Sequence, residues 1–534
     1  MRKSIEQALR PSVAILGFAL FLAINAASVW GGVFPFLPLE NQTHELLFWF
    51  YFAQSVSFFA MFLICARLVY VSHVQRIFML TTSGASTSYG LGWICLIASI
   101  YAYDFALPLL IAAGVLLGGG AAEFYLLWQR YFASTEPDQG TRAMIAGAVY
   151  GAIIYAALYI IPRAVTAFLI PVVFLPLFGL ALTLKNREID FAQPMFMDSP
   201  RENRRVYARL IRGTMRATLA IGALAFCAGI MRALAIDNPS IGSLVNILSM
   251  LGMLAAASVL LYFWRARGLN LSITRLYRVV FPLVITALVI VPLCPEGYMR
   301  WLAAGLYALY AIATLLVMLQ TAQIARDQGI HPVYAFGSIG GIVYAMHDMG
   351  FLIGSAGDQM ALSGTDPIIF TTVVTIYLLA LMFFVSTIDF KKEQADMFSD
   401  DHIELITPRE PRLPAPQIAD QDVAREAAAD PPMEQAKVEP AGDLSDFSQP
   451  STTSNGWRDR IDKQAKLLQR DFGLSNREAE VVKLVCQGNT VPSISEQLYI
   501  SENTVRTHMK RLYTKLGIHK KQELIDLAHS YKTR

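Results

Sequence analysis

The sequence predicts an all-α protein with two folded parts: a polytopic membrane bundle of about 12 spans in two six-helix halves, and a small C-terminal four-helix domain. Composition supports this prediction, because 54% of the 534 residues are hydrophobic and only 16% are charged, whereas soluble domains carry about 25% charged residues. Charge supports it too, with a net charge of +7 over residues 1–392, −10 over 393–454 and +6 over 455–534. Disorder, a single soluble enzyme and a secreted disulfide scaffold are excluded as descriptions of the whole chain.

Twelve apolar stretches of near-membrane length can be placed in residues 1–392, because a span needs about 20 mostly apolar residues. They cover residues 11–31, 46–66, 78–101, 104–128, 143–162, 164–184, 214–235, 241–264, 277–293, 298–320, 333–355 and 366–388. The third is the weakest, since residues 81–88 are small and polar. The first follows three basic residues, as in a signal peptide, but eleven more spans follow it, so we expect an uncleaved helix.

The placement of basic residues predicts the orientation of these spans. With the N-terminus in the cytoplasm, 22 Lys and Arg residues lie in the inner segments and 3 in the outer segments. This bias follows the positive-inside rule. We therefore expect a multi-pass protein of the cell (inner, cytoplasmic) membrane, with both termini in the cytoplasm.

The longest loop between spans, residues 185–213, divides them into two sets of six. This topology resembles the major facilitator fold over about 390 residues. The resemblance implies a transporter-like membrane domain. One departure is the segment after the second span, residues 66–76, which does not contain the Gly/Asp/Arg-rich signature usual in transporters of that family.

Ionisable residues inside spans are functional candidates, because a charge in the bilayer is costly. The candidates for ligand binding are Glu123, Arg232, His347 and Asp348. Their depths permit two ion pairs, Glu123 with Arg216 and Arg232 with Asp348. Two interpretations stay open. The outer residues line a ligand cavity between the halves, or they are structural, with ion pairs, a packed His347 and Arg232 reaching towards the interface.

Other motifs give no sign of catalysis or of a cofactor. The run of small residues at 118–122 predicts close helix packing, because no phosphate loop follows it. The five cysteines show no CxxC or Cys/His spacing, and the patterns HExxH, GxSxG and GxxxxGKS/T do not occur. We therefore expect no cofactor, no metal site and no enzymatic activity.

Residues 393–454 contain eight prolines and 14 acidic residues but few aromatic residues. This composition cannot bury a core, so the sequence predicts a disordered acidic linker between residues 1–392 and 455–534. A flexible chain of this length has an end-to-end distance of roughly 45 Å. The segment is either a plain tether, or its acidic residues mask the basic domain that follows.

From Trp457 onward the sequence has the pattern of a helical domain. Ser475 and Glu478 form a capping box at the start of one helix. Ser501 is expected to cap the longest helix, and Gly517 to end it. A lead-in helix and four domain helices are predicted at about 461–472, 475–488, 492–498, 501–516 and 520–530.

Two helices joined by a short turn, the second of them basic, make a helix-turn-helix. At 100° per residue, one side of the second helix is apolar, with Val505, Met509, Leu512 and Leu516. The other side carries donors of the kind that read base edges and phosphates, namely Asn503, Arg506, Thr507, Lys510 and Thr514.

About 60 residues of this domain resemble the LuxR/FixJ-type DNA-binding domain. The residues that carry the resemblance are 474–481, Gly488, Ile494, Leu498, 500–508 and 515–517. The resemblance implies a third helix that enters the major groove and a fourth that helps dimerisation. It implies that Arg506, Thr507 and Lys510 face bases. It also implies that Thr504 and His508 lie near phosphates.

Membrane regulators that join a transporter-like sensor to such a domain are a known arrangement, which the whole chain resembles. The resemblance implies a membrane-tethered, one-component transcriptional regulator that senses a small molecule and binds promoter DNA. The alternative is a major-facilitator-type transporter with an appended regulatory domain, which substrate accumulation in vesicles would reveal. The expected partners are double-stranded promoter DNA, membrane lipid, an unidentified small-molecule ligand and, on DNA, a second copy of the chain. RNA polymerase is a further candidate.

Overall fold

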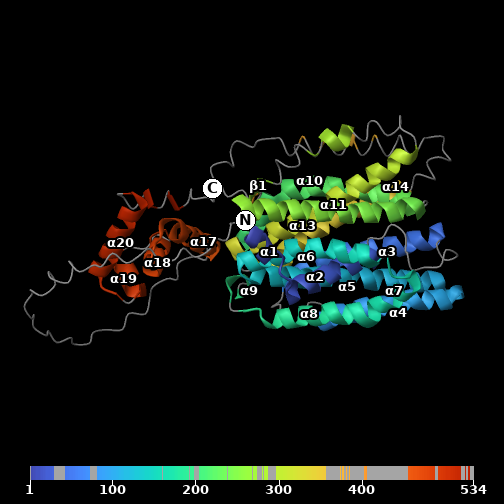
Figure 1. Cartoon of the computed structure of the whole chain (residues 1–534), viewed down its shortest axis with the longest axis horizontal. Helices are drawn as coiled ribbons and strands as arrows, with labels where there is room; N and C mark the ends of the chain where they lie inside the picture. The colour runs from blue at the N-terminus through green and yellow to red at the C-terminus, as the bar shows by residue number, and fades with distance from the viewer. Residues whose placement is uncertain are drawn as a thin grey trace, which may run out of the picture.

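The computed structural model contains a bundle of long helices and a smaller helical domain beside one end of it (Figure 1). Apart from a few isolated residues, the structure describes residues 2–28, 43–71, 81–158, 160–191, 193–197, 204–236, 239–267, 269–272, 282–286, 296–355, 402–405, 455–486, 491–498 and 500–518.

The first group of bundle helices precedes residue 190. It comprises α1 (Arg2–Leu9), α2 (Val13–Ser28), α3 (His44–Val71), α4 (Thr82–Tyr101), α5 (Ala106–Ser134), α6 (Pro137–Leu158), α7 (Arg163–Leu169) and α8 (Leu175–Arg187). Here α2 packs along α6, and both α3 and α4 pack on α5. A 3-10 turn, Tyr103–Phe105, precedes α5, and a π-helical segment, Ile170–Phe174, joins α7 to α8. Pro171 lies in this segment, where its missing N–H breaks the regular ladder.

The second group follows the short helix α9 (Pro194–Met197). It comprises α10 (Arg204–Ile236), α11 (Pro239–Arg267), α13 (Glu296–Gln328) and α14 (Pro332–Ser355). Within it, α10 packs closely along α14, and α11 packs on α13. The two groups meet where α3 contacts α14, α6 contacts α11, and α5 contacts α13 and α14. This division falls at the long loop that the sequence indicates.

Eight helices in the described part of the chain are long and apolar enough to cross a membrane. Two more coincide with predicted spans but are marginal: the apolar part of α2, Val13–Ala26, is short, and α4 is not among the eight. The predicted spans 277–293 and 366–388 lie largely outside the described residues. The described residues therefore contain eight candidate spans, and the number twelve stays a prediction.

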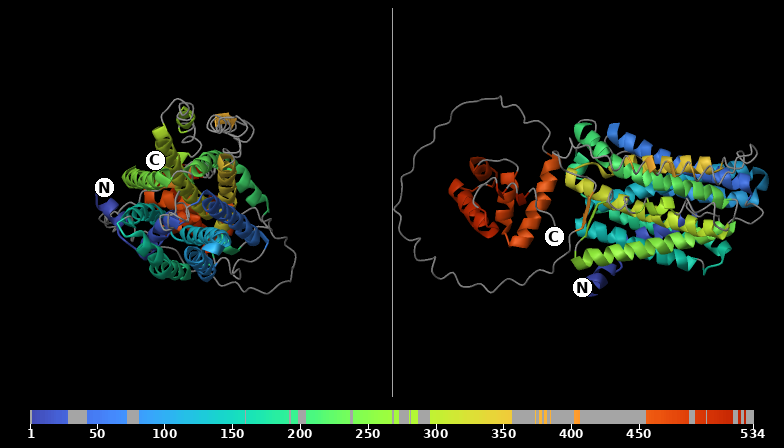
Figure 2. Two further views of the ribbon diagram at one scale, coloured as in Figure 1. Left: turned by 90° about the vertical axis from the view of Figure 1, so that its right-hand side faces the viewer. Right: turned by 90° about the horizontal axis from the view of Figure 1, so that it is seen from above.

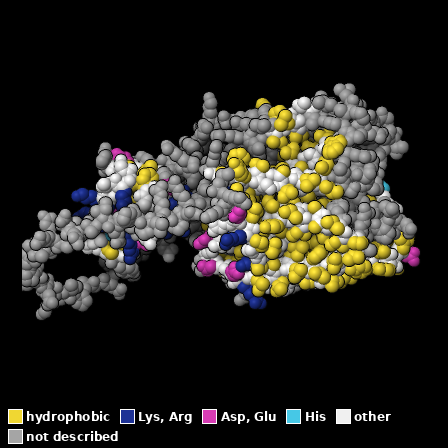
Figure 3. All heavy atoms as spheres, in the orientation of Figure 1, with side chains coloured by type: hydrophobic (Ala, Val, Ile, Leu, Met, Phe, Trp, Pro, Cys, Tyr) yellow, Lys and Arg dark blue, Asp and Glu magenta, His cyan; other side chains and the backbone are white. Residues whose placement is uncertain are grey.

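The surface of the bundle fits a membrane environment. Figure 3 shows a broad apolar surface over the bundle helices, with Lys, Arg, Asp and Glu side chains gathered at the end near the small domain. Side chains that face outward from the spans include Ile94, Val172 and Trp301, which are 60%, 69% and 62% exposed. Such large apolar side chains are stable in contact with lipid rather than water.

One departure from the all-α prediction is a pair of short strands, β1 (Leu269–Ser272) and β2 (His402–Leu405). They pair antiparallel, with Leu269 opposite Leu405 and Ser272 opposite His402. The expectation that all of residues 393–454 lack regular structure is therefore wrong for these four residues. The alternation of polar and apolar residues in His402–Leu405 suits a strand, and β1 satisfies its backbone.

The C-terminal domain comprises four described helices. They are α17 (Asn455–Phe472), α18 (Asn476–Cys486), α19 (Val491–Leu498) and α20 (Glu502–Leu516). Its apolar core includes Leu468, Val481, Ile494, Val505 and Leu512 and is separate from the core of the bundle. Figure 2 shows this domain beside the end of the bundle at which α17 lies. The predicted helix at 520–530 lies largely outside the described residues, although Leu524 and Ala528 belong to the same core.

Candidate functional site

The helix-turn-helix is formed by α19 and α20, and local bonds define both ends of α20. At the first end, the Oγ of Ser501 accepts a hydrogen bond from the N–H of Thr504 at 3.2 Å. At the last end, Gly517 has a φ of 67°, which glycine adopts without strain, and its N–H donates to the carbonyl of Tyr513. The predicted cap and stop of this helix are confirmed.

A second set of hydrogen bonds caps the start of α18 and links that helix to α20. The N–H of Ser475 donates to the Glu478 carboxylate at 2.7 Å, and the N–H of Glu478 donates to the Ser475 Oγ at 3.2 Å, which confirms the capping box. The Nζ of Lys515 donates to the same carboxylate at 2.7 Å. Burial raises the pKa of Glu478, but the bonds from Lys515 and Ser475 outweigh it, so this pKa lies below its ordinary value.

The two faces of α20 lie as the angular spacing predicts. Val505, Leu512 and Leu516 are buried, and Met509 packs against the same core. The opposite face is open to solvent, with Asn503, Thr504, Arg506, Thr507, Lys510 and Thr514 exposed and His508 half-buried. The hydroxyl of Thr507 donates to the Asn503 carbonyl at 2.9 Å, so it offers acceptor lone pairs to a ligand. Contact between these residues and DNA stays a prediction.

One exposed cation on this helix was missed by sequence reasoning. Arg511 is exposed and follows Lys510 directly. At 100° per residue it lies about 140° around the helix from Arg506, at the edge of the polar face. The same angular arithmetic would have found it.

The second candidate site is a buried polar cluster where α3 meets α10. Arg232 of α10 is 2% exposed. Its Nη2 donates to the Oε1 of Gln54 at 3.3 Å, and its Cζ lies 4.3 Å from the centre of the Tyr51 ring. The face of an aromatic ring attracts a cation, so Tyr51 stabilises the buried guanidinium.

The cluster continues onto α13 and α14. The Nδ1 of His347 lies 3.3 Å from the Oδ1 of Asp348, and both residues are buried. Tyr310 of α13 stacks on the His347 ring, with 5.7 Å between ring centres. On α10, Gly229 lies against the backbone of His347, and Arg232 follows Gly229 by about one turn of the same helix. Three of the four predicted ligand residues, Arg232, His347 and Asp348, are therefore brought together.

Neither of the two ion pairs that depth permits is found. In the described part of the chain Asp348 pairs with His347 and not with Arg232, which is held by Gln54 and Tyr51. Glu123 lies apart from this cluster on α5, 2% exposed, and no ion pair joins it to Arg216 among the described residues. The physical reason is that depth in a membrane says nothing about which face of a helix a side chain occupies.

Sequence reasoning also missed the neutral members of the cluster, Tyr51, Gln54 and Tyr310. They carry no charge, and the search for ionisable residues inside spans passed over them. Gln54 had one usable signal, because an amide in an otherwise apolar span needs a hydrogen-bond partner.

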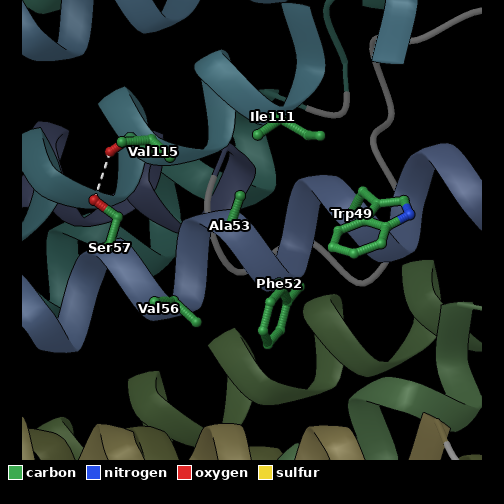
Figure 4. Close-up of a pocket in the computed structure, with 7 residues that line it drawn as sticks. All are labelled: Trp49, Phe52, Ala53, Val56, Ser57, Ile111 and Val115. Atoms are coloured by element: carbon green, nitrogen blue, oxygen red, sulfur yellow. Dashed lines mark hydrogen bonds between the residues drawn. The ribbon is translucent and has the colours of Figure 1, made fainter. Parts of the chain in front are cut away.

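An apolar pocket of about 360 Å³ lies on another face of α3 (Figure 4). It is open to the outside and lies between α3 and α5. Its one hydroxyl, that of Ser57, donates to the carbonyl of Val115 at 2.6 Å. The residues that line it are Trp49, Phe52, Ala53, Val56, Ser57, Ile111 and Val115. It has no charged group and does not include the polar cluster.

The close approach predicted for the small residues 118–122 is confirmed. A Cβ at Gly118 would meet the carbonyl of Gln54, and one at Gly120 would meet the backbone of Tyr89. Among the described residues, no group of three or more His, Cys, Asp or Glu side chains could hold a metal ion, and Cys65, Cys95, Cys227 and Cys486 are free thiols.

Comparison with known proteins identifies the family of the C-terminal domain. Residues 473–528 match the family described as "Bacterial regulatory proteins, luxR family". The domain is therefore a LuxR-type helix-turn-helix, as its motifs predict.

Relatives of the chain are similar to it over this domain. The Fimbriae Z protein of Salmonella typhimurium is 40% identical over 62 residues, which are 12% of this chain and 30% of that protein. A putative transcriptional regulator of Pseudomonas aeruginosa is 38% identical over 71 residues, 13% of this chain and 33% of that protein. The probable transcriptional regulatory protein NarL of Mycobacterium tuberculosis is 47% identical over 45 residues, 8% and 21% of the two chains. The chain thus spans a third or less of the length of these relatives.

The membrane region is similar to solved transporter structures. A bacterial homologue of the iron transporter ferroportin, in an outward-facing state, is 12% identical with a TM-score of 0.49, covering 72% of this chain and 99% of that chain. The fucose:proton symporter of Escherichia coli is 12% identical with a TM-score of 0.43, covering 70% and 96%. The resemblance of the membrane region to the major facilitator fold is one of topology, with two groups of helices joined by a long loop.

Proposed function

We propose that this chain is a membrane-anchored transcriptional regulator that binds promoter DNA through α20 and responds to a small molecule through its spans. The observation that carries the proposal is one chain with both a LuxR-type helix-turn-helix and eight helices able to cross a membrane. The exposed donors on α20 support the first part. The function is regulatory rather than catalytic, and two copies of the chain would bind one operator, with RNA polymerase as a further partner.

The proposal includes an orientation. Both termini lie in the cytoplasm of a cell whose inner membrane holds the bundle, because DNA is found on that side. The excess of basic residues in the inner segments supports this orientation, as does the charged end of the bundle near the C-terminal domain (Figure 3).

The first test addresses the DNA-binding face. The fragment 455–534 has its own core and should bind DNA that flanks its coding sequence more tightly than unrelated DNA. Arg506→Ala and Lys510→Ala should each cost about 1–3 kcal/mol, or roughly five- to 150-fold in affinity, and together abolish the preference. Fluorescence anisotropy measures both affinities. Arg477→Ala is the matched control, an exposed arginine on α18. If Arg506→Ala and Lys510→Ala keep the wild-type preference, the assignment of α20 is wrong.

The second test addresses small-molecule sensing by the polar cluster. We propose that Arg232, His347 and Asp348 contact the ligand, with Glu123 as a separate buried candidate. A reporter fused to the adjacent genes, screened against small organic molecules, should respond in the wild type and lose the response in Arg232→Gln and Asp348→Asn. Transcript levels measure the response. Ligand accumulation in vesicles that contain the protein would instead favour the transporter alternative.

A further inference from the structure

Side chains tie the two groups of bundle helices together through α5 and α13. Gln129 of α5 is fully buried, and its Nε2 donates to the carbonyl of Met318 at 2.9 Å and to the Oγ1 of Thr321 at 2.8 Å. In the other direction, the Nη1 of Arg326 on α13 donates to the carbonyl of Phe132 on α5 at 2.9 Å. These bonds lie along the last turns of both helices, so they hold the same ends together.

A third tie joins α6 to α11. The Nη1 of Arg265 lies 3.1 Å from the Oδ1 of Asp138, and the arginine side chain is only 5% exposed. Arg142 on α6 offers a contrast, because it donates to the carbonyls of Ala8 and Arg10 at 2.9 and 2.8 Å, all within the first group. The two groups are therefore fastened by specific side chains, and a comparable arginine nearby takes no part.

Helix α13 also touches both segments that lead to the DNA-binding domain. Strand β2 pairs with β1, which directly follows α11, and β2 contacts α13. Helix α17 contacts α13 on one side and α18 on the other. In Figure 2 α17 lies between the bundle and the rest of the C-terminal domain.

Helix α17 is covered on more than one side. Its residues Ala465 and Leu468 belong to the core of the DNA-binding domain. Gln464 and Leu467 are also buried, each 5% exposed, yet they lie outside that core. A lead-in helix that only extended the small domain would expose this second side to water.

We infer that α13 is the element by which the bundle holds the DNA-binding domain, and that separation of α13 from α5 releases that domain. The inference rests on the proposed function, for which it gives the route from the spans to DNA. While the ties of Gln129 and Arg326 persist, α13 stays beside α5, and α17 stays docked on α13. A ligand acts on this equilibrium only by binding one arrangement more tightly than the other.

Double electron–electron resonance measures distances between two spin labels, and on the full chain in nanodiscs it tests whether α17 is docked on α13. Spin labels are placed at Lys466→Cys on α17 and Glu188→Cys after α8, both exposed, with the native cysteines replaced. The labelled protein that keeps Gln129 and Arg326 should give one narrow peak in the distribution of label-to-label distances. In Gln129→Ala with Arg326→Ala that peak should be lost to a broad distribution at longer distances. Arg142→Ala is the matched control and should keep the narrow peak.

Two results overturn the inference. One is a broad distribution with all ties intact, and the other is an unchanged narrow peak in the folded double variant. Neither result touches the DNA-binding part of the proposed function, which fails if the fragment 455–534 does not prefer its own flanking DNA.

A cross-link keeps the inference testable if the double variant does not fold. Thr135→Cys after α5 and Arg326→Cys on α13 are both partly exposed, and a bismaleimide that bridges them in the full chain, with the native cysteines replaced, fixes α13 to α5. The bridged protein should bind the flanking DNA less tightly than the unbridged one. In two bridged copies, each DNA-binding domain stays docked on its own bundle, so the pair is less free to take the relative position that one operator requires. Equal affinity before and after bridging, with the bridge verified by mass spectrometry, overturns the inference.

Discussion

At the scale of single residues, Glu478 shows how one carboxylate serves two helices. It closes the capping box of α18 and accepts the Lys515 ammonium from α20, and its side chain is 4% exposed. A carboxylate buried to this degree is costly without a partner, so Lys515 stabilises the domain mainly by preventing that cost. The tie lies about 180° around α20 from Arg506 and fixes how that helix is presented.

The pKa of Glu478 predicts acid sensitivity of the C-terminal domain. Because the folded pKa is lower than the unfolded one, the stability it contributes is present above about pH 4.5 and is lost as pH falls through the folded value. Lys515→Met should lower the free energy of unfolding by about 1–2 kcal/mol at pH 7, a range reduced because Lys515 is partly exposed. It should also flatten the pH dependence. Urea unfolding of the fragment 455–534 between pH 7 and pH 3 measures both.

Arg477→Ala is the control for this prediction. Arg477 and Glu480 form a pair on the same helix at 2.7 Å, but both side chains are about half exposed. Exposed pairs contribute about 0–1 kcal/mol. If Arg477→Ala lowered the free energy of unfolding as much as Lys515→Met does, the burial of Glu478 would not be the reason that Lys515 stabilises the domain.

At the scale of elements, the contact between α10 and α14 depends on glycine. A Cβ at Gly229 would meet the backbone carbonyl of His347, and a Cβ at Gly350 would meet that of Phe226. Backbone cannot move aside as a flexible side chain can. The two helices therefore form one closely packed unit, and this packing fixes the helix that carries Arg232 against the helix that carries His347.

A larger residue at this contact should force the helices apart. Gly350→Val should destabilise the protein by about 1–3 kcal/mol or more, because small-to-large changes in a packed interface displace the backbone. Thermal unfolding of the full chain in detergent measures the loss. Gly305→Val on α13 is the matched control, since nothing lies within 4 Å of a Cβ built there. Equal losses in the two variants would show that the close contact with the backbone of Phe226 is not responsible.

Prediction from the sequence succeeded where a local pattern determines the structure. Capping residues, the stop at Gly517 and the apolar face of α20 are local, and all were predicted. The partners of Arg232 were not predicted. Its contacts with Gln54 and Tyr51 join residues about 180 positions apart, and no local sequence pattern specifies how the two helices are rotated relative to each other. The pairing of β1 with β2 was missed for the same reason, because its partner residues lie more than 100 positions apart in the sequence.

At the scale of the whole molecule, the C-terminal domain has an apolar core of its own, separate from the apolar clusters of the bundle. The core of the C-terminal domain contains residues from α17 to α20 and none from the bundle. Helices α18 and α20 are capped by side chains of the domain itself. The domain therefore has the internal contacts that independent folding requires.

The fragment 455–534 should fold without the bundle. We expect a helical circular dichroism spectrum and a single cooperative urea transition, because one core and one set of caps are intact. Val505→Ala should lower its stability by about 1–3 kcal/mol, since the side chain is fully buried. Lys466→Ala is the control, an exposed residue of α17. A broad, non-cooperative transition in the unsubstituted fragment would mean that the contact with α13 is needed for folding.

The contact of α17 with α13 has a consequence for where regulation takes place in the cell. A domain held at the end of a bundle diffuses in two dimensions with that bundle, and it does not search the chromosome. For the regulator proposed above, the operator must therefore travel to the membrane, and the rate of binding depends on how often that stretch of chromosome visits the membrane. Moving the target genes to a locus that visits the membrane rarely would slow the response, even though the affinity for DNA is unchanged.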